Sequence, residues 1–489
     1  MKPIYQRLSI LVLAIVLGAC NKNFNAINTD PNTSTSLSPQ YLLSTALIST
    51  AYAYQDEAFM GKPGEAGRYI TKVRNEADDL FGWSSESWDG YYNTLSINDE
   101  MYTLAAQGKM SQYMAVSKVI RVFNFAFITD LYGDCPYSDA LHSKDSNIVH
   151  PKYDSQASIY PDLLKTLTAA NDSLANTSLA LDKTYDVLYN GNILKWRKFA
   201  NALHLRLLMR IASKDATAFA QIQSIVNDPV RYPLFESNAD EAGVKYLGVT
   251  KSDSWQGGNL VSSVTEMNKY KPSKEIVDTL LSLNDPRLSV WVAPVTQATG
   301  YTIDPNTYVG VPNAIPSPYD YNGGEAHISE LSAMFYANAS PMLKASLMTY
   351  AEQCFILAEA AQHGGVTVSG ETAASLYAKG IGASMDANGI SSTVQNTYLQ
   401  QPAVVYNGTL SQLITQKWVA LFLKGAEGWF DHRRTGLPAF VPGPLSAIRS
   451  IPSRFIYPVT EQSYNLSSYQ QALVQQGADQ TTTLMWYLK

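Results

Sequence analysis

The chain has 489 residues, a formal net charge of −6 at pH 7 and only 16% charged residues. Tight nucleic-acid binding needs a basic surface, so this acidic balance argues against a nucleic-acid partner. The three cysteines and six histidines lack the spacing of a disulfide framework or a zinc site, and we expect no metal and no cofactor. Two cysteines, Cys135 and Cys354, are expected to be free and buried.

The first twenty residues have the features of a bacterial lipoprotein signal. Lys2 and Arg7 precede an apolar run at residues 8–17, which is too short to span about 30 Å of hydrocarbon. The run Leu-Gly-Ala-Cys that ends at Cys20 then forms a lipobox, in which the thiol is acylated and the preceding peptide bond is cut. We therefore predict a signal peptide at residues 1–19 and lipid attachment at Cys20. The alternative is an ordinary secretory signal with a chance cysteine.

Residues 20–38 are predicted to be a lipidated tether, because Asn, Thr, Ser and Pro dominate them. Asn21 stands where aspartate would be the usual signal for retention in an inner membrane, so the outer membrane is favoured. Later in the chain we find no stretch of 18 continuous apolar residues, and lipid is therefore the expected anchor.

Two helical regions are predicted, at residues 39–227 and 342–425. Ser38 and Pro39 suit the N-cap and first position of the opening helix, and apolar residues recur at three- and four-residue steps in later segments. A second helical segment is predicted to begin after Asp89 as its cap, and the helical pattern then continues until Gly133. Asn192 is the predicted cap of a helix at 193–211. The other predicted helices cover 158–174, 346–362, 373–385 and 410–423. We predict a mainly α fold of packed helix pairs in one domain, residues 39–489.

Residues 228–341 lose the helical periodicity and contain ten of the 23 prolines, together with many aromatic residues. Long irregular segments on a helical scaffold commonly carry binding surfaces, so this loop-rich region is the predicted place of ligand recognition. The whole chain is rich in tyrosine, with 31 Tyr and 8 Trp against 15 Phe. These side chains combine a flat apolar face with a polar tip, which suits sugars or peptides.

Several charged motifs have a structural interpretation that we prefer to a catalytic or anion-binding one. The adjacent carboxylates Asp56-Glu57, Asp78-Asp79 and Asp240-Glu241 could supply acid and base groups, but neighbouring residues rarely face one substrate atom. Arg206 and Arg210, one helical turn apart, are expected on the polar face of a helix and paired to carboxylates. Asp431 with Arg433-Arg434 similarly predicts a local ion pair at a helix end.

An ordered series of segments resembles the SusD/RagB family of outer-membrane lipoproteins, in its SusD-like branch. They are Trp88–Asn98, Asp130–Pro136, Pro151–Tyr160, Gly191–Asn201, Ala358–Ala360, Gln416–Trp418 and Glu427–Gly436. The agreement covers essentially all of the chain after Cys20. Gly133 and Pro136 can stop a helix and Asn192 can cap one, so these motifs are typical of a scaffold rather than of an active site.

The resemblance implies a tetratricopeptide-like helical protein, without catalytic activity, that sits on a SusC-like TonB-dependent β-barrel at the cell surface. It would capture glycans and deliver them for import; a peptide or other nutrient cargo, a scaffold without ligand, and a surface glycosidase are the alternatives. The aromatic residues of this sequence that we expect to stack on an oligosaccharide are Trp83, Trp255, Tyr301, Tyr319 and Tyr321.

Overall fold

The computed structural model describes residues 37–143, 146–295 and 307–489, and Pro39–Lys489 forms one compact unit. The predicted signal peptide, Cys20 and most of the tether lie outside the described residues.

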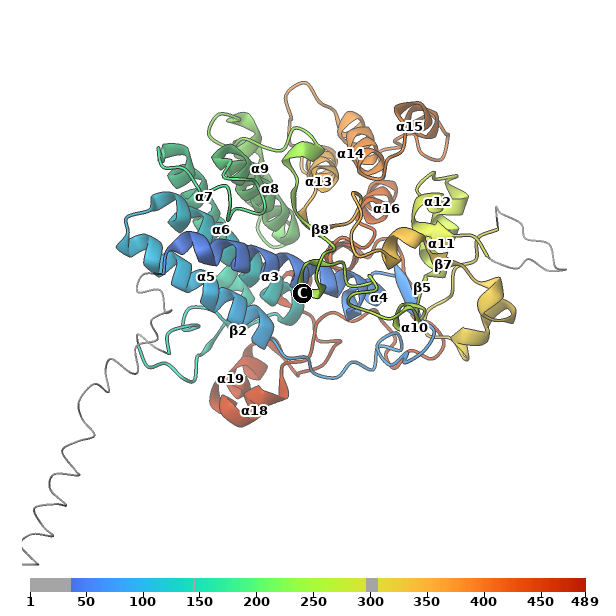
Figure 1. Ribbon diagram of the computed structural model, residues 1–489, viewed down its shortest axis with the longest axis horizontal. Coiled ribbons are helices and arrows are strands. Elements are labelled where there is room, and N and C mark those ends of the chain that lie inside the picture. The colour runs from blue at the N-terminus through green and yellow to red at the C-terminus, as the bar shows by residue number, and fades with distance from the viewer. Residues whose placement is uncertain (1–36, 144–145, 296–306) are drawn as a thin grey trace, which may run out of the picture. The chain divides into compact units, whose positions relative to one another are not determined.

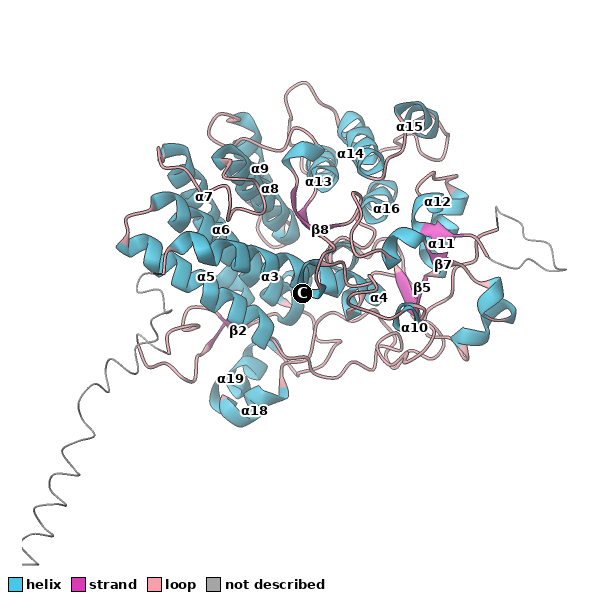
Figure 2. Ribbon diagram, viewed as in Figure 1, coloured by secondary structure: helices cyan, strands magenta, loops and turns pink. Residues whose placement is uncertain are grey.

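The α-helices of the described part are α3 Pro39–Phe59, α4 Lys62–Ala66, α5 Asp89–Gln107, α6 Ser111–Tyr132, α7 Gln156–Asn176, α8 Ile193–Ile211, α9 Ala218–Asn227, α10 Val264–Met267, α11 Lys274–Ser282, α12 Leu288–Trp291, α13 Tyr350–His363, α14 Ala373–Ala387, α15 Ser392–Leu399, α16 Leu410–Ala420, α17 Glu427–Thr435, α18 Val459–Tyr464 and α19 Leu466–Gln476. The fold is mainly helical, as the sequence predicted (Figure 2).

Helices that follow one another in the chain pack as pairs, which confirms the predicted scaffold. The closest pairs are α5 with α6, α6 with α7, α7 with α8, and α13 with α14. In Figure 1, helices α3 and α5–α9 gather on one side, and α10–α12 lie with the loop-rich middle of the chain on the other. Their apolar faces form one large core, whose fully buried members include Trp196, Trp418 and Trp429.

Helix α8 shows how local sequence determines these elements. Its bounds, Ile193–Ile211, are the predicted ones, and the side chain of Asn192 accepts a hydrogen bond from the backbone N–H of Lys195. This bond satisfies one of the N–H groups that a helix leaves without a partner at its start. The predicted cap at Asn192 is therefore confirmed.

Two predicted helix starts are wrong. Asp89 is the first residue of α5 rather than its cap, because Trp88 occupies the N-cap position. The helix predicted from residue 346 begins only at α13, where Thr349 caps it by accepting a hydrogen bond from the N–H of Glu352. The residues before it form strand β8, since pairing with β4 satisfies their backbone groups.

The strands form four small antiparallel sheets among the described residues: β1 Ile70–Lys72 with β5 Tyr270–Pro272, β2 Cys135–Pro136 with β3 Tyr153–Asp154, β4 Ala242–Lys245 with β8 Lys344–Met348, and β6 Val292–Ala293 with β7 Glu330–Leu331. The short 3₁₀ turns are η1 Asn238–Asp240, η2 Lys251–Asp253, η3 Pro318–Gly323, η4 Glu325–His327, η5 Ala333–Tyr336 and η6 Trp486–Leu488. Strand β5 connects the loop-rich middle to the N-terminal part of the scaffold, because its partner β1 directly follows helix α4.

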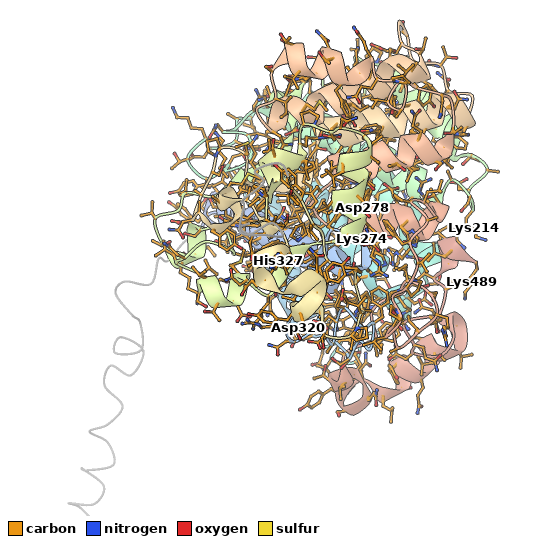
Figure 3. The ribbon with its side chains drawn as sticks, turned by 90° about the vertical axis from the view of Figure 1, so that its right-hand side faces the viewer. Lys214, Lys274, Asp278, Asp320, His327 and Lys489 are labelled. Atoms are coloured by element: carbon orange, nitrogen blue, oxygen red, sulfur yellow. The ribbon has the colours of Figure 1, made fainter. Side chains whose placement is uncertain are left out.

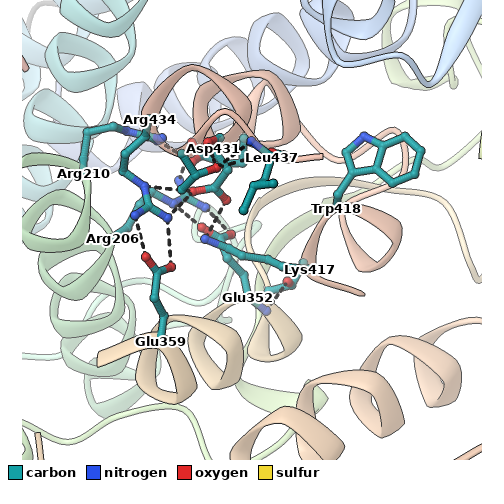
Figure 4. Close-up of polar contacts among 12 residues, drawn as sticks. Arg206, Arg210, Glu352, Glu359, Lys417, Trp418, Asp431, Arg434 and Leu437 are labelled. Atoms are coloured by element: carbon teal, nitrogen blue, oxygen red, sulfur yellow. Dashed lines mark hydrogen bonds and ion pairs between the residues drawn. The ribbon is translucent and has the colours of Figure 1, made fainter. Parts of the chain in front are cut away.

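A buried network of ion pairs joins five helices of the scaffold (Figure 4). Its members are Asp130, Arg206, Arg210, Glu352, Glu359, Lys417, Glu427, Asp431 and Arg434. Arg206 forms two bonds with Glu352, at 2.7 and 2.6 Å, and Arg210 pairs with both Asp130 and Glu427. The predicted pairing of the two arginines is confirmed, but both side chains are buried in the core, so they do not lie on a polar face of the helix.

The network contains residues from most of the segments that carry the family resemblance. Asp130, Glu359, Lys417 and Arg434 come from four such segments, and Arg434 lies 3.0 Å from Asp431 in the predicted local ion pair. The cations surrounding Asp431 outweigh the effect of its burial and hold its pKa well below the usual range. These motifs therefore have a structural role in the scaffold.

Cys135 and Cys354 are free and buried, as predicted. Burial raises the pKa of the Cys354 thiol to about 12, which keeps it protonated and unreactive.

Within the described ranges, none of the helices has the length and apolar character needed to cross a membrane.

Candidate ligand-binding site

The residues from 307 to 331, which we call the tyrosine loop, are attached to the scaffold through strand β5. The N–H of Val311 donates to the carbonyl of Pro272, and the N–H of Lys274 donates to the carbonyl of Val311. The hydroxyl of Thr71 on β1 also donates to Val311, at 2.8 Å. These bonds attach an irregular segment to rigid elements, as a binding loop requires.

A small apolar cluster, separate from the main core, joins the loop to Val73. Val73, Val311 and Ile328 are buried in it, and the rings of Tyr319 and Tyr321 pack against it. Both tyrosines remain partly exposed, in contrast to the aromatic residues of the main core. The structure therefore brings together two of the five predicted ligand-binding aromatics.

Tyr319 lies between a cation and a carboxylate. The guanidinium of Arg74 is 4.2 Å from the centre of its ring, and its hydroxyl donates to Glu325 at 3.0 Å. Burial opposes ionisation of Glu325, but the bond from Tyr319 and the cations Lys271 and Arg74 outweigh it and lower the pKa of this carboxyl. Arg74 lies over the Tyr319 ring, so the exposed part of the ring and the guanidinium are the contacts that this turn offers to a ligand.

Lys271 of strand β5 holds the part of the tyrosine loop that contains Glu325 and Glu330. Its ammonium is fully buried and pairs with both Glu325 and Glu330, and Glu330 also accepts a hydrogen bond from Tyr336 at 3.2 Å. A buried cation with two carboxylate partners stabilises one arrangement of the loop, because loss of Lys271 would leave both carboxylates without their cation. The position of Tyr319 is thus determined by a lysine on strand β5.

Tyr321 lies near the start of α11, and the side chain of Asn322 donates to the carbonyl of His327 at 2.8 Å. Asp278 accepts a hydrogen bond from Lys274, and this bond is the main cause of the raised pKa of the lysine. The nearby Tyr321 hydroxyl also raises the pKa of Lys274. Figure 3 shows Lys274 and Asp278 on the same side of the molecule as Asp320 and His327. The loop therefore displays phenol, amide and imidazole groups, and the start of α11 adds the ammonium of Lys274; all of these can bond to sugar hydroxyls.

Trp83 and Trp255 do not belong to this site, so their prediction as stacking residues needs correction. They are only 5% and 1% exposed. The Trp83 indole donates to the carbonyl of Asp78 and packs against Trp429 and Phe455, and that of Trp255 donates to the carbonyl of Phe335. A ring covered on both sides by protein offers no face to a sugar, so we assign both to the core. Tyr301 lies outside the described residues.

Sequence reasoning missed Arg74, Lys271, Glu325 and Glu330, which surround the two tyrosines. Their separations along the chain are large, and no local periodicity connects a lysine on strand β5 to carboxylates more than fifty residues later. Only the alternation of strand residues could have indicated that Lys271 points to one side of β5.

The adjacent carboxylates have structural roles, as preferred from the sequence. The buried carboxylate of Asp79 accepts hydrogen bonds from Asn313 and from the N–H of Ala314, which anchors the start of the tyrosine loop. Asp240 pairs with Lys198 at 2.8 Å, and Glu57 accepts a hydrogen bond from Tyr91. In the described residues we find no group of three His, Cys, Asp or Glu side chains able to hold a metal ion.

The structure thus combines a helical scaffold with a polar, aromatic loop that buried charges hold in place. The model of SusD-like proteins, described as starch-binding and associating with the outer membrane, matches residues 31–458. The chain therefore belongs to the SusD-like family. It is a non-catalytic nutrient-binding protein of the outer membrane, and this excludes the surface glycosidase alternative.

Solved structures agree with this assignment. A SusD homolog from Bacteroides fragilis is 26% identical, with a TM-score of 0.80, over 93% of this chain and 100% of its own. A second homolog from the same organism is 23% identical with a TM-score of 0.81, over 93% and 100% of the two chains. A chitin-binding SusD homolog from Flavobacterium johnsoniae shares the fold at 23% identity and a TM-score of 0.76, over 91% and 98%. A comparison with curated proteins gives no match.

Proposed function

We propose that this protein captures oligosaccharides at the cell surface and delivers them to a SusC-like TonB-dependent β-barrel in the outer membrane. The observation that carries the proposal is the partly exposed pair Tyr319 and Tyr321 on a polar loop that buried charges hold in place. Flat aromatic rings with hydrogen-bonding neighbours suit pyranose sugars, which present apolar ring faces and many hydroxyls. The alternatives are a peptide or another nutrient as cargo, and a scaffold that contacts only the barrel.

The double substitution Tyr319→Ala, Tyr321→Ala should weaken oligosaccharide binding by about 25-fold, because each stacked ring contributes on the order of 1 kcal/mol. A glycan array and a peptide library would first identify the ligand, and calorimetry would then compare the variants. Tyr464→Ala is the matched control, since Tyr464 is 74% exposed on helix α18. Equal affinity of the double variant and the wild type would disprove the assignment of the site, and binding of peptides alone would favour the alternative cargo.

When the barrel partner is not co-produced, the variant Cys20→Ala should leave the membrane fraction, because it lacks the acyl chains by which we propose that the protein is anchored. Fractionation followed by mass spectrometry of the N-terminus would test this. The purified variant should still bind the ligand, and loss of binding would mean that the lipid is more than a tether.

Affinity purification of the wild type from detergent-solubilised membranes should recover a SusC-like barrel. Recovery of the protein alone would contradict the proposed partnership.

A further inference from the structure

Two adjoining hollows are formed by parts of the chain far in sequence from the tyrosine loop. The larger lies between helices α7, α8 and the turn η6, and the smaller between β3, the start of α7, α19 and η6. Their volumes are about 520 and 360 Å³, and Ala157 and Trp486 line both. Volumes of this size are typical of small-molecule sites. We call the larger hollow, which lies along α7, α8 and the start of α9, the Trp486 groove.

The indole of Trp486 forms a partly exposed wall between the two hollows. Its ring is backed by the buried ring of Tyr160, at 6.2 Å between centroids, and the hydroxyl of Tyr160 donates to Asp130 at 2.5 Å. Trp486 therefore borders open space in both hollows and also contacts a buried ring of the scaffold, unlike the buried Trp83 and Trp255. A supported aromatic face at a hollow suits stacking of a flat apolar ring face.

The polar groups of this groove that remain available are mainly hydrogen-bond donors. The ammonium groups of Lys165 and Lys214 form no hydrogen bond or ion pair with any described residue, and Lys214 lies at the edge of the molecule in Figure 3. Asp215, the carboxylate of the groove, accepts the N–H and hydroxyl of Thr217 on one oxygen, at 2.8 and 2.6 Å, and keeps its negative charge. The groove thus offers two exposed cations against one carboxylate.

His204 lines the same groove and is only 5% exposed, and neither of its ring nitrogens has a partner among the described residues. A buried polar group without a hydrogen bond is uncommon and indicates an additional binding partner, such as a ligand or water. Burial lowers the pKa of this histidine to about 4, so that its ring is neutral at pH 7 and can donate one bond and accept another.

We infer that the Trp486 groove is a second binding site, for a sugar that carries an anionic group such as a carboxylate or a sulfate. The ring face of the sugar would stack on Trp486, its anion would lie between Lys165 and Lys214, and a hydroxyl would bond to His204. A neutral sugar would leave the two cations unpaired, whereas an acidic peptide would make no use of the indole face.

Calorimetry on the purified full chain would test the inference with a galacturonic acid trisaccharide, a sulfated galactose disaccharide, a neutral galactose trisaccharide and triglutamate. At least one anionic sugar should bind more tightly than the neutral sugar and triglutamate, and its affinity should fall as salt is raised from about 20 to 300 mM. Lys165→Gln with Lys214→Gln should weaken it about tenfold. Trp486→Ala should weaken it about fivefold.

Lys183→Gln with Lys251→Gln is the matched control, because both lysines are exposed and lie outside the groove, and it should retain full affinity. The Tyr319→Ala, Tyr321→Ala variant should also bind normally, which separates this site from the one in the proposed function. The inference is overturned if both anionic sugars fail to bind at about 10 mM, or if triglutamate binds as tightly as they do. Unchanged affinity in the well-folded lysine double variant would overturn it as well.

Discussion

Replacing Arg206 by methionine should lower the free energy of unfolding by about 3–5 kcal/mol. Arg206 is 5% exposed, and it donates to both oxygens of Glu352 and to the carbonyl of Leu347. Methionine fills much of the same volume but leaves a buried carboxylate without its cation, and the cost of that uncompensated charge is large. Urea unfolding followed by circular dichroism measures the change.

The control for this experiment is Arg231→Met, which removes an ion pair with Asp172 in which both side chains are exposed. Its unfolding midpoint should stay close to that of the wild type, because solvent screens an exposed pair. The double variant Arg206→Met, Glu352→Leu should recover part of the lost stability, since it removes both buried charges. If Arg206→Met unfolded at the wild-type midpoint, the network would have no part in holding the helices together.

Acidification should destabilise the protein through His204, by about 3 kcal/mol between pH 6.5 and pH 4. Desolvation by burial lowers the pKa of this histidine from 6.5 to about 4 in the folded state. In this interval the unfolded chain therefore binds a proton that the folded chain does not. The stabilising contribution is complete above pH 6.5 and is lost as the pH falls towards 4.

The variant His204→Leu isolates this contribution from all other acid effects. Urea unfolding of the wild type and the variant at pH 7, 6, 5 and 4 gives the difference in their free energies of unfolding. That difference should shift by about 3 kcal/mol in favour of the variant across the series. His150→Leu is the control, because His150 is exposed. A constant difference between wild type and His204→Leu would show that the histidine titrates alike in the folded and unfolded chains.

The helices of the scaffold could be predicted well because their signals are local. Helix α8 begins after the predicted cap Asn192 and has the predicted bounds. The start of α13 could not be predicted, since residues 346–348 continue the apolar periodicity of the helix but pair with strand β4 more than a hundred residues earlier. Long-range strand pairing overrode the local pattern there.

The binding residues were predicted only in part, for a related reason. Tyrosine and tryptophan have the same chemistry in a core and at a binding surface, so composition could not separate the buried Trp255 from the partly exposed Tyr319. Lys271 and Glu325 lie 54 residues apart and meet only when strand β5 and the tyrosine loop fold together. Nor did any motif indicate the groove that joins His204 to Trp486.

The sequence by itself determined the mainly helical class, the cap of helix α8 and the family resemblance, and it predicts lipid attachment at Cys20. Each of these depends on residues close together in the chain or on ordered motifs. The tertiary structure decided which aromatic residues are buried, how Arg206 is paired, and which loop presents Tyr319. Burial and long-range ion pairing depend on how distant segments pack, and neither periodicity nor composition encodes that arrangement locally.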